Sequence, residues 1–126
     1  MTTKLISKAP IGIFDSGLGG LTVLRSLEKI LPNESFIYFG DTAHVPYGSK
    51  SADTIIRYSR DIMEFFLTQS NTKAVVIACN TASAVAFQKI RSSYDIPLFD
   101  VVAPSVVHSN NLSQTRKIGV IGTYST

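Results

Sequence analysis

Short apolar runs alternate with longer segments of helical periodicity along most of this chain. Apolar runs occupy residues 10–14, 36–39 and 74–78, and polar turn residues follow each of them. The segments between these runs repeat apolar side chains at a spacing of three and four residues, which is the period of an α-helix. Strands and helices that alternate in this way form βαβ units. The sequence therefore predicts an α/β fold with an open, mostly parallel sheet and helices on both faces.

The clearest predicted helix covers residues 51–70. There Ile55, Ile62 and Phe66 recur at helical spacing, and Ser51 is available as an N-cap. Other helices are expected at residues 21–31, 82–94 and 104–111, further strands at 98–102 and 117–121, and a helix start at 123–126. No repeat or low-complexity linker interrupts the chain before about residue 100, so the sequence predicts no internal boundary there.

Composition and charge exclude several classes of protein. The net charge is only +3, and the basic residues are spread from Lys4 to Lys117, so we expect no nucleic-acid surface. No apolar run approaches the roughly 18 residues that a membrane span requires, and residues 1–9 lack the apolar core of a signal peptide. These features predict a cytoplasmic protein without a membrane partner.

Cysteine and histidine are too scarce for a metal site. Cys79 is the single cysteine, which rules out a disulfide within the chain and a site with several thiolates. His44 and His108 lie far apart and neither has a metal-ligand spacing. We therefore expect no bound metal.

Polar loops follow three of the predicted strands. They cover residues 15–20, 41–48 and 79–83. Parallel strands bring their carboxyl ends to one edge of the sheet, which is where ligands bind in open α/β folds. The sequence therefore predicts that these loops converge on one site for a small molecule.

Cys79 is the best candidate for chemistry in these loops. It ends an apolar strand and precedes a helix, whose free N–H groups and dipole would stabilise a thiolate that can act as a base. The alternative is a small buried hydrophobic residue. Asp15 is a second candidate for proton exchange, with an Asx turn or a helix cap as its structural alternative.

The neighbouring residues are candidates for substrate binding. Ser16, Asn80 and Thr81 have polar groups for carboxylates or ammonium, or they cap helices. Tyr47 and Gly48 form a tight turn that can present backbone N–H groups and an aromatic wall, or that simply packs as a loop. Asp41 and His44, in the same loop, are assigned to a turn and not to catalysis.

The glycine-rich turn at residues 17–22 leaves a second function open. It suggests a dinucleotide- or phosphate-binding fingerprint, and Asp41 lies near the distance expected for a ribose-binding acid. However, Thr22 stands in place of the third glycine, and Asp15 would put negative charge beside a pyrophosphate. A close approach of backbone to ligand explains the glycines better.

Residues 9–126 resemble the first half of the glutamate racemase family. The resemblance rests on the segments Phe14-Asp15-Ser16-Gly17-Leu18-Gly19-Gly20, Pro46-Tyr47-Gly48 and Ala78-Cys79-Asn80-Thr81-Ala82-Ser83, in the family's order and spacing. It implies a two-domain, pseudo-symmetric α/β fold, with residues 1–100 as the N-terminal domain and residues 101–126 as the crossover and the truncated start of the second domain.

The resemblance also implies a reaction. The family interconverts L- and D-glutamate without a cofactor and supplies D-glutamate for peptidoglycan, and each half donates one catalytic cysteine. Cys79 matches the first cysteine, with Asp15 as its partner. Substrate contacts are implied for Asp15, Ser16, Tyr47, Gly48, Asn80, Thr81, Thr123 and Thr126. The second cysteine is absent, so the resemblance implies that this chain alone is inactive.

Two relatives of the same fold and two kinds of partner remain open at this stage. An aspartate or hydantoin racemase is the nearest alternative, and a binding module without catalysis is a more distant one. A homodimer would cover apolar surface left by truncation, and a regulatory partner such as DNA gyrase is known for some members of the family.

Overall fold

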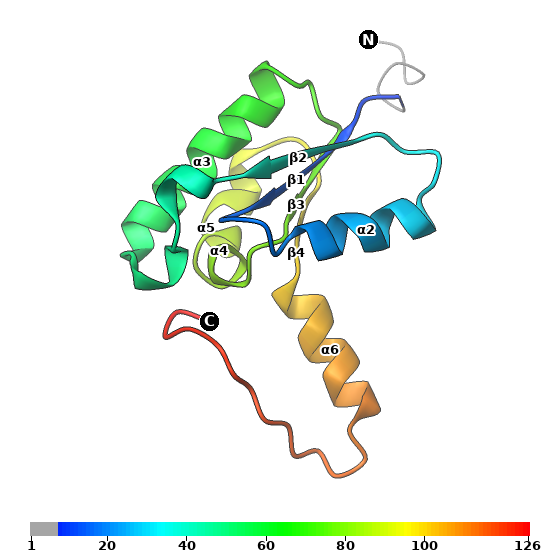
Figure 1. The fold of residues 1–126 in the computed structure, drawn as a ribbon, viewed down its shortest axis with the longest axis vertical. Helices are drawn as coiled ribbons and strands as arrows, with labels where there is room; N and C mark the ends of the chain where they lie inside the picture. Colours follow the sequence, from blue (N-terminus) through cyan, green and yellow to red (C-terminus); the bar gives the residue numbers. More distant parts are fainter. Residues whose placement is uncertain (1–7) are drawn as a thin grey trace.

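A parallel sheet of four strands forms the centre of the molecule (Figure 1). The computed structural model describes residues 8–126. The strands are β1 (Ile11–Asp15), β2 (Phe36–Gly40), β3 (Ala74–Ile77) and β4 (Leu98–Asp100), in the order β2-β1-β3-β4. Every pair of neighbours is parallel. The predicted α/β class is confirmed.

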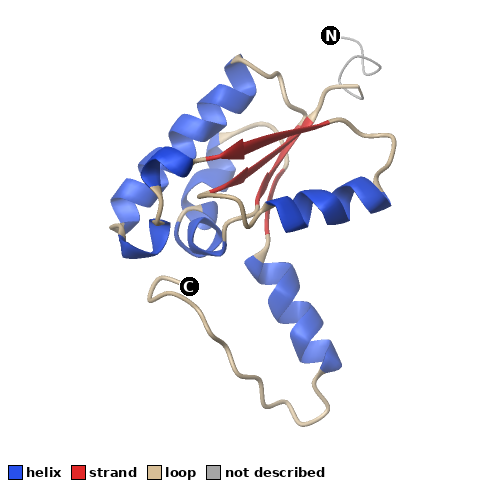
Figure 2. Cartoon of the chain, in the orientation of Figure 1, coloured by secondary structure: helices blue, strands red, loops and turns tan. Residues whose placement is uncertain are grey.

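Helices lie on both faces of the sheet (Figure 2). α2 (Leu21–Ile30) covers one face, while α3 (Ala52–Thr68), α4 (Asn80–Val85) and α5 (Phe87–Ile90) cover the other. The main core lies under the second group and joins both central strands to these helices. Its members include Phe14, Ile55, Met63, Phe66, Val75, Ile77, Ala82 and Ile90, all completely buried. Burial on this scale provides most of the free energy that holds the layers together.

The start of α3 confirms the predicted cap. The Ser51 hydroxyl accepts a hydrogen bond from the backbone N–H of Thr54 at 3.3 Å. This bond satisfies one of the N–H groups that a helix leaves unpaired in its first turn.

The predicted helix at residues 82–94 is divided and begins earlier. α4 starts at Asn80 because the Cys79 sulfur already accepts the Ala82 N–H, 3.5 Å away, and so caps the helix. Ala86 separates α4 from α5, and a 3-10 turn, Arg91–Ser93, follows. The prediction of helical structure is right, but its start and its continuity are wrong.

The strand predicted at residues 98–102 ends at Asp100. Asp100 Oδ1 accepts hydrogen bonds from the N–H groups of Val102 and Ala103, each at 2.8 Å. These bonds cap α6 (Val102–Leu112), which extends the helix predicted at residues 104–111. A carboxylate at a helix start competes successfully with continuation of the strand.

The strand predicted at residues 117–121 is absent from the described structure. A strand needs a partner for its backbone groups, but α6 carries the chain away from the sheet and β4 remains at the edge (Figure 1). Val120 and Ile121 are exposed as a result. The expected helix start at residues 123–126 is a turn, closed by a 3.0 Å hydrogen bond from Thr126 N–H to the Thr123 carbonyl.

Two findings concern the chain as a whole. Residues 1–7 of the predicted N-terminal domain lie outside the described residues. Among residues 8–126, no helix is both long and apolar enough to cross a lipid bilayer.

Candidate active site

A cavity of about 680 Å³ opens at the carboxyl ends of β1 and β3. The chain leaves β1 toward β2 on one side and enters β3 on the other, so this is the point at which the strand order reverses. Such reversal points bind ligands in open α/β sheets. The lining includes all the residues predicted for the site: Asp15, Ser16, Tyr47, Gly48, Cys79, Asn80, Thr81, Thr123 and Thr126. Their predicted common location is thus found, whereas their roles remain predictions.

Asp15 holds the turn between β1 and α2. Its side chain is only 7% exposed, and its Oδ2 accepts a 3.0 Å hydrogen bond from the Gly20 N–H. Gly20 approaches so closely that a Cβ there would lie 2.7 Å from the Cβ of Asp15 and 2.9 Å from that of Ala78. Asp15 is therefore not the N-cap of α2, which is Gly20, but it binds the N–H of that residue from the wall of the cavity.

Tyr38 supports this turn from β2, a role that the sequence does not predict. Its hydroxyl donates a 2.9 Å hydrogen bond to the Gly17 carbonyl. Burial raises the pKa of Tyr38 to about 12, and the negative charge and hydrogen bonding of Asp15 contribute further. Tyr38 therefore keeps its proton, and hence its bond to the loop, well above neutral pH.

Cys79 lies where β3 passes into α4. The residue is 5% exposed, and its thiol lies 3.5 Å from the Ser16 hydroxyl. The Ala82 N–H points at the same sulfur, also at 3.5 Å. The sulfur thus lies at a helix N-terminus, with two hydrogen-bonding neighbours, in the wall of the cavity.

Hydroxyl groups of three threonines line another part of the cavity. The Thr81 and Thr123 hydroxyl oxygens are 3.3 Å apart, and Thr123 and Thr126 are joined at 2.8 Å. Thr123 also touches Gly48, because a Cβ on that glycine would lie 2.6 Å from Thr123 Cγ2. The last residues of the chain thus contact the loop after β2 and the first turn of α4.

Tyr47 contributes less aromatic surface to the cavity than the sequence suggested. Its side chain is only 2% exposed, and its hydroxyl donates a 2.6 Å hydrogen bond to Asp41 Oδ2. Burial, followed by the hydrogen bond to Asp41, raises the pKa of Tyr47. Val45, Pro46 and Gly48 line the cavity beside Tyr47.

The position of Asp41 argues against the dinucleotide hypothesis. It is 6% exposed, it does not line the cavity, and its carboxylate also receives His44 Nδ1 at 2.8 Å. A ribose-binding acid must be free to reach its ligand. The structure therefore provides no such acid at this position.

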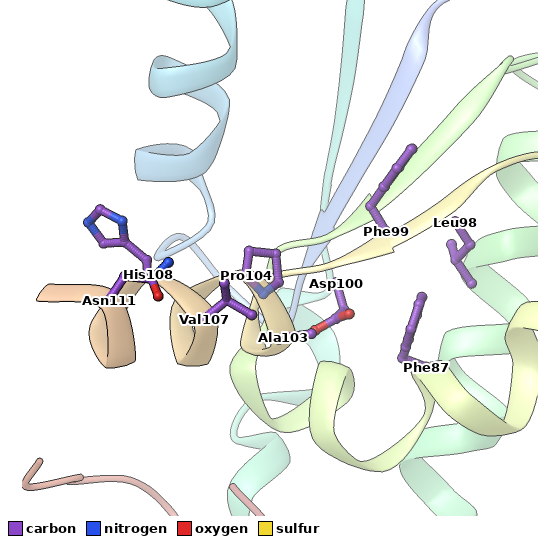
Figure 3. A pocket seen from close by; sticks show the side chains of 9 residues that line it. All are labelled: Phe87, Leu98, Phe99, Asp100, Ala103, Pro104, Val107, His108 and Asn111. Atoms are coloured by element: carbon purple, nitrogen blue, oxygen red, sulfur yellow. The ribbon is translucent and has the colours of Figure 1, made fainter. Parts of the chain in front are cut away.

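A second cavity, of about 500 Å³, lies between β4, α5 and α6 (Figure 3). Phe87, Leu98, Phe99 and Val107 form much of its wall, and Asp100 is already bonded to the first turn of α6. None of the residues predicted for chemistry lies there. The cavity at β1 and β3 is consequently the candidate active site.

Known proteins of similar sequence are glutamate racemases. One from Trichormus variabilis is 50% identical over 119 residues, which make up 94% of this chain and 40% of the relative. Another from Thermus thermophilus is 49% identical over 119 residues, or 94% of this chain and 45% of the relative. The chain therefore spans less than half the length of these relatives.

Solved structures of similar fold carry the same name. The glutamate racemase from Aquifex pyrophilus superposes with a TM-score of 0.86 at 46% identity, over 92% of this chain and 46% of that one. The glutamate racemase from Francisella tularensis, solved in complex with D-glutamate, superposes with a TM-score of 0.75 at 46% identity, over 83% of this chain and 40% of that one.

The family comparison covers nearly the whole described chain. Residues 11–126, which contain every loop of the candidate active site, match the family described as Asp/Glu/Hydantoin racemase. The members named above are isomerases that share both sequence and fold with this chain. The chain belongs to the Asp/Glu/Hydantoin racemase family.

Proposed function

We propose that this chain forms one half of a glutamate racemase active site, with Cys79 as its acid/base group. The observation that carries the proposal is the position of the only cysteine, at the helix N-terminus in the cavity where the three polar loops meet. The identity of about 50% to glutamate racemases supports glutamate as the substrate.

In the proposed reaction, the Cys79 thiolate removes the α-proton of one glutamate enantiomer. The electron pair of the C–H bond remains on the substrate, delocalised between the α-carbon and its carboxylate, and the sulfur becomes a thiol. A second thiol on the other face then donates a proton to the α-carbon. The net result is inversion without gain or loss of atoms.

The substrate would be held by groups that surround the thiol. Asp15 can bind the ammonium group or exchange a proton with Cys79, since its carboxylate lies at the same cavity wall. Ser16 offers a hydroxyl beside the sulfur, Asn80 and Thr81 offer polar groups from the start of α4, and Thr123 and Thr126 offer hydroxyls next to Thr81. Backbone N–H groups near Gly48 would bind a carboxylate.

Inversion needs acid/base groups on both faces of the planar intermediate, and this chain has one cysteine. We therefore propose that the chain alone does not racemise glutamate at an enzyme-like rate. The proposal assigns residues 1–100 to the half-site domain and residues 101–126 to the crossover toward a second domain, which would provide the other base. Within this proposal the complete enzyme acts in the cytoplasm and supplies D-glutamate for peptidoglycan.

The test is α-deuteration of L- and D-glutamate by the purified chain in deuterated water. NMR follows the loss of the α-proton, and optical rotation follows inversion. We expect slow α-deuteration without inversion, because one base can exchange the proton on one face only. The Cys79→Ala variant should show no exchange above the buffer rate, since alanine can neither remove nor return a proton.

Three outcomes would contradict parts of the proposal. Efficient inversion by the chain alone would remove the requirement for a second thiol. Equal exchange in the Cys79→Ala variant would remove Cys79 from the chemistry. Faster exchange of aspartate than of glutamate would favour the aspartate racemase alternative, which the family assignment also includes.

A further inference from the structure

Asp41 holds the loop after β2 in place but does not line the cavity. Asp41 is 6% exposed and is not among the residues that line the candidate site. Its backbone N–H donates a 2.9 Å hydrogen bond to the Asp15 carbonyl at the end of β1. Its carboxylate accepts hydrogen bonds from His44 and Tyr47 of its own loop, residues 41–48. Asp41 is therefore connected to two of the three loops that form the site.

The bond to Tyr47 is the stronger of these connections. The Tyr47 hydroxyl lies 2.6 Å from Asp41 Oδ2, a length typical of a hydroxyl bonded to a charged carboxylate. Both side chains are almost completely buried. Because water cannot replace a partner at such depth, loss of either one leaves the other unsatisfied.

His44 completes the arrangement from the outer side. Its Nδ1 lies 2.8 Å from Asp41 Oδ1, and its ring stacks on Tyr58 of α3 with centroids 4.0 Å apart. The ring centroids of Tyr47 and Tyr58 are 5.9 Å apart. The carboxylate thus has a donor on each oxygen, and the donors are themselves packed against a helix.

The geometry points to a function for this bond. We propose that Asp41 is a positioning residue of the active site, which acts through the Tyr47 hydroxyl to fix the backbone of residues 46–48 against the cavity. The inference rests on the proposed function, because it assigns the backbone N–H groups of this loop to a substrate carboxylate. Tyr47 then acts as an anchor, and its ring is not a substrate contact.

The amides of the chain itself provide a test that needs no ligand. The Lys50 N–H bonds to the Tyr47 carbonyl at 3.0 Å and reports on the loop, whereas the Ile55 N–H bonds to the Ser51 carbonyl in α3 and reports on the surrounding fold. In the Tyr47→Phe variant, we expect hydrogen exchange at Lys50 to accelerate about tenfold relative to Ile55. A purely structural role would accelerate both amides equally.

Two further variants sharpen the comparison. Asp41→Asn keeps an oxygen that can accept from Tyr47 and should retain most of the protection at Lys50, while Asp41→Ala should lose it. The matched control is Tyr58→Phe, because that ring packs in the same cluster but its hydroxyl forms no hydrogen bond within the described residues. Unchanged exchange at Lys50 in both Tyr47→Phe and Asp41→Ala would overturn the proposal.

A titration of the ¹⁵N-labelled chain with L-glutamate separates this inference from the proposed function. We expect the amides of Gly48 and Asn80 to shift in the unvaried chain, and about tenfold more glutamate to be needed in Tyr47→Phe. If the amides of the unvaried chain do not shift, glutamate binding is contradicted. The ratio of the hydrogen-exchange rates at Lys50 and Ile55 would still show whether Asp41 and Tyr47 position the loop. A normal titration in a Tyr47→Phe chain whose loop exchanges fast would show that the fixed backbone is not needed for binding.

Discussion

At the scale of single residues, Tyr38 makes the stability of the site dependent on pH. Its pKa is raised from the ordinary value of 10.0 to about 12 in the folded chain, first by burial and then by Asp15. In the unfolded chain the hydroxyl loses its proton at lower pH. The folded state therefore binds more protons between these two values, and stability that is fully present below pH 10 must fall as the pH rises toward 12.

We predict that Tyr38→Phe flattens this alkaline loss of stability. At pH 8 the variant should be less stable by about 1 kcal/mol, because the hydrogen bond to the Gly17 carbonyl is gone. Above pH 10 the difference should shrink, since phenylalanine has no proton to lose. Urea denaturation from pH 8 to 11 measures this, with Tyr124→Phe as the control because Tyr124 is fully exposed. A constant difference across the series would contradict the prediction.

The sequence predicts the residues that line the cavity, but it does not predict the residues that support them. Asp15 and Cys79 follow apolar strands directly, so parallel topology alone brings them to one edge. Tyr38 looks like an ordinary strand residue until β1 and β2 are paired in register, which brings it beside Ile13 and under the Gly17 loop. Asp41 has the isolated polar character of a turn residue, and only the folded loop shows that its carboxylate binds the buried Tyr47 hydroxyl.

At the scale of elements, the turn from β1 into α2 depends on the absence of a side chain at Gly20. Gly20 has φ −63° and ψ −12°, which alanine adopts without strain. The constraint is one of space, because a Cβ would meet Asp15, Ala78 and the Tyr38 hydroxyl at 2.7, 2.9 and 3.1 Å. The strand end and the helix start are therefore packed as one unit.

We predict that Gly20→Ala destabilises the chain by about 1–3 kcal/mol, the usual cost of overpacking. The backbone of β1 or β3 must shift to make room, so α-deuteration of glutamate should fall as well. Gly119→Ala is the matched control, because a Cβ there has no atom within 4 Å. Urea denaturation of both variants gives the comparison, and equal midpoints would contradict the packing argument.

The boundaries of helices and strands are where the local sequence pattern no longer predicts the structure. The apolar run at residues 117–121 has the composition of a strand, yet pairing is a property of two segments and the run has no partner among the described strands. The helix after β3 begins two residues before the predicted residue 82, although cysteine is not a usual capping residue. The Cys79 sulfur nevertheless accepts the Ala82 N–H and starts the helix at Asn80.

At the scale of the whole molecule, α6 carries an uncovered apolar surface. Val106, Val107 and Leu112 are each more than 60% exposed, and Phe99 of β4 is 54% exposed beside them. Of these residues, Val107 and Phe99 line the apolar cavity between β4 and α6 (Figure 3). Exposed apolar surface promotes association.

We predict that the chain self-associates through this surface, so that its sedimentation coefficient rises with concentration. Val107→Lys should reduce the association, because a charged side chain cannot be buried at an apolar contact without a partner. Ile30→Lys is the control, since Ile30 is 70% exposed but lies at the end of α2. Equal effects of the two substitutions would assign the association to general hydrophobicity, and a concentration-independent coefficient would contradict it.

The candidate site is completed by contacts between segments far apart in the sequence. Ser16 and Cys79 are separated by 63 positions, and Thr81 and Thr123 by 42. Contacts that close such long loops form late during folding, because the entropy of the intervening chain must first be overcome. The thiol of Cys79 is thus freely accessible in the unfolded chain and 5% exposed once the cavity has formed. No other cysteine competes for the alkylating reagent. The rate at which Cys79 is alkylated during refolding therefore measures how fast the cavity forms, without any engineered probe.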